Sequence, residues 1–119
     1  MNDTNKNEYL DALRTASGVI DKIGYIAQGS NLVYDFTDAD WTTPVAGGKL
    51  VNDSVINFEN TSGSDISIIG VGIFSSGAQT LTSGSTEAGA AVDIYNFSEV
   101  VTLEDGEILR LSTYEYTVN

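Results

Sequence analysis

The chain has 119 residues, 17 of them acidic and five basic, and a net charge of −12. This length fits one domain. Histidine and cysteine are absent, which excludes disulfides, zinc sites of the usual Cys/His type and the common nucleophile–base pairs. Nucleic acids and anionic membranes are poor partners for so acidic a chain, because both attract basic surfaces. We expect a single domain over residues 1–119 with no cofactor, no metal, and neither nucleic acid nor membrane as a partner.

The N-terminal segment has the periodicity of an amphipathic helix. Its apolar side chains recur at steps of three and four, at Tyr9, Leu13, Ala16, Ile20 and Ile23. Asn5 and Glu8 have the spacing of a capping box, which predicts a helix from about Asn5 to Ser17 inside a helical segment of residues 5–23. The apolar stripe of such a helix must pack on the β domain or on another chain.

From residue 24 onward the pattern is that of β-strands and turns. The expected strands cover residues 25–26, 32–36, 55–58, 66–73, 91–97, 100–103, 107–112 and 114–118. Residues 37–50 are predicted as a loop and residues 59–65 as a turn. Residues 76–90 are predicted as a loop that is either mobile or ordered by contact. Asp105-Gly106 stands between two apolar alternating runs, which predicts a β-hairpin. We therefore expect a mainly β protein, an antiparallel β-sandwich (jelly-roll-like) over residues 24–119 with one N-terminal amphipathic helix.

The run SIIGVGIFSS, residues 67–76, is apolar yet contains Gly70 and Gly72. Its alternation slips at Ile68–Ile69, which indicates a bulge or burial on both faces. Glycine inside a strand indicates that another group approaches the backbone closely. We expect that group to come from this chain's own packing, with a symmetry-related subunit as the alternative.

Two acidic groups have the oxygen ligands that calcium prefers. They are Asp35, Asp38 and Asp40, and Glu104, Asp105 and Glu107. Neither has the spacing of an EF-hand loop, so we interpret both as solvated turn residues rather than as metal ligands.

Aromatic residues are the other candidates for a site. Trp41 is expected in the core at one end of the sandwich, with an interface anchor or a sugar-stacking platform as alternatives. Tyr114 and Tyr116 share one face of the last strand and are expected to pack. The candidate interface residues are Tyr9, Leu13, Trp41, Leu81, Tyr114 and Tyr116. No catalytic residue is expected, although a carboxylate pair of the glycosidase type is compatible with the composition.

The order of these segments resembles a family of small virion structural proteins of tailed bacteriophages, described as tail-fibre-like, minor tail or head-decoration proteins. The resemblance lies in the N-terminal helix, in INFENTSGSDISIIGVGIFSS (56–76), in the small-residue loop after it, and in VVTLEDGEILRLSTYEYTV (100–118). Asp105-Gly106 stands where the family usually has Gly-Asp.

The resemblance implies a structural role without catalysis. The expected partners are other virion proteins, either major capsid or tail proteins, and copies of the chain itself. The expected location is the virion, after synthesis in the host cytoplasm. The alternatives are a carbohydrate- or receptor-binding module of a phage tail that uses Trp41 and the 76–90 loop, and a small enzyme acting on polysaccharide.

Overall fold

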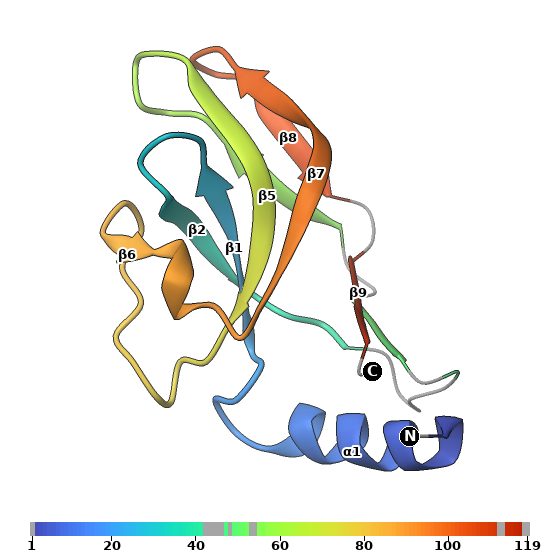
Figure 1. The fold of residues 1–119 in the computed structure, drawn as a ribbon. Coiled ribbons are helices and arrows are strands. Elements are labelled where there is room, and N and C mark those ends of the chain that lie inside the picture. Colours follow the sequence, from blue (N-terminus) through green and yellow to red (C-terminus); the bar gives the residue numbers. More distant parts are fainter. Residues whose placement is uncertain (1, 42–46, 48, 53–54, 112–113, 118–119) are drawn as a thin grey trace.

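The structure is a computed structural model that describes residues 2–41, 47, 49–52, 55–111 and 114–117. An N-terminal helix, α1 (Asp3–Thr15), lies across one end of two β layers (Figure 1). The larger layer is a five-stranded antiparallel sheet in the order β6-β2-β1-β5-β7. Its strands are β1 (Lys22–Ala27), β2 (Leu32–Asp38), β5 (Ile66–Phe74), β6 (Thr86–Glu87) and β7 (Asp93–Leu103). The predicted class is confirmed: the chain is mainly β, with one N-terminal helix.

The smaller layer is a two-stranded antiparallel ribbon in two parts. β3 (Lys49–Asn52) pairs with β9 (Tyr114–Thr117), and β4 (Ile56–Glu59) pairs with β8 (Ile108–Leu111). One part ends with the pair Asn52↔Tyr114 and the other begins with Ile56↔Leu111, so the register moves by one residue between them. We call these four strands the ribbon. β2 and β3 each extend into the predicted 37–50 loop, and that prediction was wrong at residues 37–38 and 49–50.

The main core lies between the five-stranded sheet and the ribbon. Tyr25 of β1 is fully buried, and its ring stacks on Phe58 of β4 at 5.1 Å. The Tyr25 hydroxyl donates a hydrogen bond to the Ile56 carbonyl oxygen at 3.1 Å. A buried aromatic side chain with a satisfied hydroxyl contributes both apolar area and a directional link. This contact fixes the two layers of the predicted sandwich against each other.

The opposite face of the five-stranded sheet is buried too. Ile26, Val33 and Phe74 form a second core there with Ala88, and Leu81 packs against it. The cover comes from the segment between β5 and β7, which contains β6 and a 3₁₀ turn at Ala88–Ala90. Of the two forms expected for residues 76–90, the loop ordered by contact is the one found, although residues 86–90 form β6 and the 3₁₀ turn rather than a loop. A single sequence does not reveal this, because small residues suit both a loop and a tightly packed cover.

Glycines in β5 lie where neighbouring groups approach the backbone. A Cβ atom at Gly70 would lie 2.3 Å from the Tyr95 carbonyl oxygen of β7. A Cβ atom at Gly72 would lie 2.8 Å from the Phe74 ring. Both contacts are too close for any side chain. The expectation that this chain's own packing fills the space is confirmed.

The predicted slip near Ile68–Ile69 is confirmed as a β-bulge. The β5–β7 pairing steps from Ile68↔Val101 to Gly70↔Asn96, so Ile69 alone faces residues 97–100. The extra residues are on β7, which is one continuous strand rather than the two predicted at residues 91–97 and 100–103. A bulge of this kind bends the strand and interrupts its regular pairing.

The predicted hairpin at Asp105-Gly106 was wrong. A turn does form, with the Glu107 amide donating to the Glu104 carbonyl oxygen at 3.0 Å. However, β7 before it pairs with β5, and β8 after it pairs with β4, so the chain crosses from one layer to the other. The turn over residues 60–65, between β4 and β5, crosses in the same way. Alternation and turn residues do not separate a hairpin from such an arch, because the local signal is the same.

Asn60 joins the two crossing turns. Its side chain is fully buried, and Nδ2 donates to the carbonyl oxygens of Ser64 at 2.7 Å and Leu103 at 2.9 Å. Its backbone amide donates to the Glu107 carbonyl oxygen, and its carbonyl oxygen accepts from the Gly106 amide. Asn60 therefore links the turn after β4 to the turn after β7 by hydrogen bonds, at the corner of the sandwich where both turns cross between the layers.

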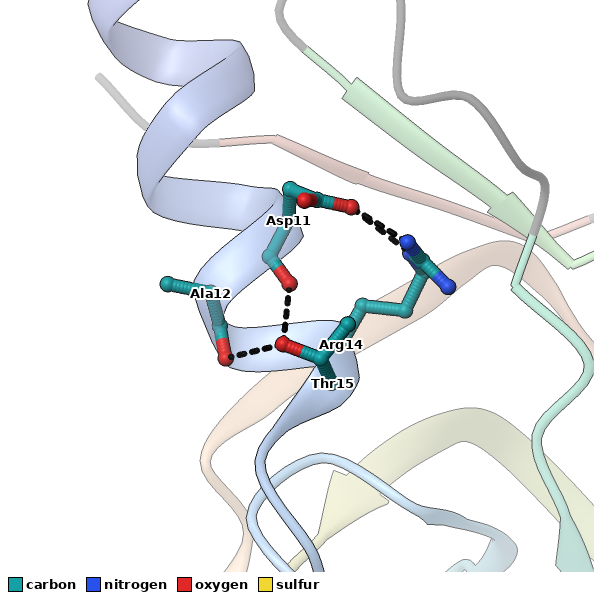
Figure 2. Close-up of polar contacts among 4 residues, drawn as sticks. All are labelled: Asp11, Ala12, Arg14 and Thr15. Atoms are coloured by element: carbon teal, nitrogen blue, oxygen red, sulfur yellow. Dashed lines mark hydrogen bonds and ion pairs between the residues drawn. The ribbon is translucent and has the colours of Figure 1, made fainter.

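Helix α1 begins two residues earlier than the Asn5 start that the Asn5–Glu8 pair predicts. Asn2 is the N-cap, and its side chain accepts a hydrogen bond from the Asn5 amide at 2.8 Å. The helix ends at Thr15, so Ile20 and Ile23 lie outside it. Figure 2 shows the last turn, where Arg14 pairs with Asp11 and the Thr15 hydroxyl donates to the Asp11 carbonyl oxygen at 2.9 Å. The buried Leu10 and the half-buried Leu13 pack on the main core, so α1 docks on its own domain.

Candidate interaction surface at the β7 edge

β7 is an edge strand, eleven residues long, and most of it is exposed. Ile94, Tyr95 and Val100 are 41%, 55% and 45% exposed. An edge strand presents backbone amides and carbonyls that can pair with another chain, and apolar side chains add affinity there. The bulge at residues 97–100 limits regular pairing along this edge to Asp93–Asn96 and Val101–Leu103.

A pocket of about 460 Å³ opens beside the first half of β7. Tyr95 and Phe97 line it from β7, Leu111 from β8, and Tyr114 and Glu115 from β9. The pocket therefore lies at the open flank of the sandwich, between the edge of the five-stranded sheet and the ribbon. We call it the flank pocket.

The rings around the flank pocket form one aromatic cluster. The Tyr95 ring lies 6.0 Å from Phe97 and 6.2 Å from Tyr114. Trp41 lies behind, 6.3 Å from Tyr114 and 6.5 Å from Tyr116. Such tilted and edge-on contacts are favourable between aromatic rings. The cluster joins Trp41, which follows β2, to residues of β7 and β9, and these segments are far apart in the sequence.

The electrostatic surroundings of the pocket are acidic. The Tyr114 hydroxyl lies 3.4 Å from the Asp93 carboxylate. Burial raises the pKa of Tyr114 strongly, and the Asp93 charge adds to this. Burial also raises the pKa of Tyr116, with Asp93 and Tyr9 as further causes. Both phenols consequently remain neutral hydrogen-bond donors at neutral pH.

The predicted interface residues do not form a single site. Trp41, Tyr114 and Tyr116 come together in the aromatic cluster, but Tyr114 is only 4% exposed and Trp41 is half-buried. The Trp41 Nε1 donates to the Ile20 carbonyl oxygen at 2.8 Å, and Trp41 packs against the main core from its margin rather than inside it. Leu13 and Leu81 pack on two different cores, whereas Tyr9 is 48% exposed on α1.

The interpretation of both acidic groups as turn residues was wrong for Asp35 and Asp38, which lie in strand β2. Asp38 pairs with Lys22, and Asp105 accepts a hydrogen bond from the Gly63 amide at 2.9 Å. The Glu107 carboxylate accepts from the Glu104 amide at 2.7 Å. Among the residues that the structure describes, no three acidic side chains converge on a metal position.

Tyr95 and Phe97 are not among the surface residues that the sequence predicts. Both alternate within a predicted strand, and alternation alone does not tell an edge strand from a central one. Their exposure follows from the strand order, which places β7 last in the sheet. The only available signal was the concentration of aromatic residues at positions 95 and 97.

Comparisons with protein-family models, curated proteins and solved structures found no match to this chain. In the described part of the chain, no helix has the length and apolar character needed to cross a bilayer.

Proposed function

We propose that this chain is a structural component of a bacteriophage virion that docks on a capsid or tail protein as a decoration, cement or fibre-attachment protein. The sequence resemblance supplies the virion context. The observation that carries the docking role is the exposed edge of β7 with its apolar side chains and the adjoining flank pocket. Docking through such a surface needs no chemical step, and the acidic remainder of the surface stays hydrated.

Co-sedimentation tests this proposal. The purified full chain is mixed with particles of the phage that encodes it, from which the native copies have been stripped, and then centrifuged. The proposal predicts that the chain sediments with capsids or tails and saturates at a fixed ratio. A chain that stays in the supernatant at every ratio contradicts the proposal.

A second candidate function is carbohydrate or receptor binding by a phage tail. The flank pocket favours it, because the Tyr95 ring is more than half exposed and carboxylates lie nearby. An exposed aromatic ring gives a sugar an apolar surface to stack on, and carboxylates accept hydrogen bonds from its hydroxyls. A glycan array probed with the wild-type chain and Tyr95→Ala separates the candidates, because only a glycan-binding module loses a specific signal on substitution.

A further inference from the structure

We infer that the β7 edge binds an extended basic segment of a partner polypeptide, which adds a strand to β7 and places a cationic side chain in the flank pocket. This inference rests on the proposed docking role and names the chemistry of the partner.

The backbone of β7 provides the first part of the argument. In the described sheet β7 pairs with β5 on one side only, and Asp93–Asn96 keeps a regular register there. A strand added on the other side would form main-chain hydrogen bonds along this stretch, the mode of recognition known as β-augmentation. The bulge that starts at Phe97 limits the added strand to a short segment, so binding requires further contacts from side chains.

The position of the flank pocket provides the second part. The Tyr95 ring contacts Tyr114 of β9, so this face of β7 points toward the ribbon. Alternate side chains of an added strand would point the same way. They would therefore enter the space between the layers, where Tyr95, Phe97 and Tyr114 present their rings.

Charge identifies the side chain that fits. Aromatic rings attract cations to their faces, and the Asp93 carboxylate beside Tyr114 adds negative charge. Glu115 lines the flank pocket but is paired with the Lys49 ammonium group at 3.1 Å, so the charge that selects a cation is that of Asp93. The molecule carries a net charge of −12, so a second copy approaching this edge is repelled, whereas a basic segment is attracted. Arginine fits best, because its planar group stacks on aromatic rings and pairs with carboxylates.

The experiment uses the full ¹⁵N-labelled chain and two synthetic peptides, Val-Arg-Val-Arg-Val and its counterpart with glutamate in place of arginine. The inference predicts that the basic peptide shifts amide signals of residues 93–97 and 114–116, that added salt weakens binding, and that the acidic peptide does not bind. Tyr95→Ala should weaken binding by about tenfold. Ile108→Ala is the matched control, since Ile108 is 56% exposed on β8 and should leave binding unchanged.

A third peptide, the basic sequence with alternate backbone nitrogens methylated, tests strand addition separately. It should bind at least about tenfold more weakly because it cannot complete the main-chain ladder. Three results overturn the inference: equal binding of the acidic and basic peptides, shifts centred elsewhere, or no shift at peptide concentrations of about 1 mM. Should the peptides fail while co-sedimentation with virions succeeds, only this inference falls and the docking role stands.

Discussion

Replacing Asn60 with alanine should cost a large part of the stability of this domain. The Asn60 side chain is fully buried, and its amide holds the Leu103 and Ser64 carbonyl oxygens at 2.9 and 2.7 Å. Ser64 is exposed, so water can replace the lost bond there, but the Leu103 carbonyl oxygen stays buried without its donor. A buried polar group left without a partner costs about 1–3 kcal/mol. With the lost packing, we expect a decrease of about 2–4 kcal/mol in the free energy of unfolding.

Urea denaturation followed by tyrosine and tryptophan fluorescence measures this loss. Asn57→Ala is the matched control, because Asn57 lies on β4 with an exposed side chain, and it should change stability by less than about 0.5 kcal/mol. Asn60→Asp should be more destabilising at neutral pH than at acid pH, because an ionised carboxylate would face two carbonyl oxygens. If Asn60→Ala and Asn57→Ala have the same midpoint, the cross-linked turns do not hold the sandwich corner and the reasoning is refuted.

Three further substitutions test the fold. Gly70→Ala places a Cβ atom 2.3 Å from the Tyr95 carbonyl oxygen and should lower the unfolding free energy by about 1–3 kcal/mol. Gly89→Ala, with open space around its Cβ position, should not, and equal effects would contradict the close approach of β7. Burial works to raise the pKa of Asp21, but hydrogen bonds from Ser76 outweigh it and the pKa is lowered. The stability that Asp21 contributes is therefore present above its unfolded pKa and lost as pH falls, so Asp21→Asn should be destabilising at pH 7 and neutral in acid; a constant difference contradicts this. Asp35 has a positive φ of 55° and a pKa raised by burial. The ionised carboxylate is therefore unfavourable, and above that pKa Asp35→Asn should melt at a slightly higher temperature than the wild type. A variant that melts below the wild type at pH 7 would refute this.

The sequence predicts much of the fold because strong local signals agree with it. The apolar spacing of Leu13 with Tyr9 indicates the helix, the slip at Ile68–Ile69 indicates the bulge, and Gly70 indicates the close approach of another group. These features depend on local backbone geometry and on the alternation of side chains, so they can be recognised in a single sequence.

The layer assignments could not be predicted in the same way. Asp105-Gly106 has the local signature of a hairpin, yet the strands on either side belong to different layers. The N-cap residue is Asn2 rather than Asn5. The sequence could not decide between them, because both have the same side chain and only the geometry of the first turn distinguishes them. The candidate surface depends on these choices, since Tyr95 is exposed only because β7 is the last strand of the sheet. Strand order is a tertiary property, and alternation does not encode it.

The most direct test of the proposed role is the location of the chain in intact particles. The proposed role predicts that an antibody raised against this chain, used in negative-stain microscopy of virus particles purified from cells that produce the chain, labels repeated positions on a capsid or a tail. Particles that carry no label, while the chain is found only in the soluble fraction of the lysed host, would contradict the account.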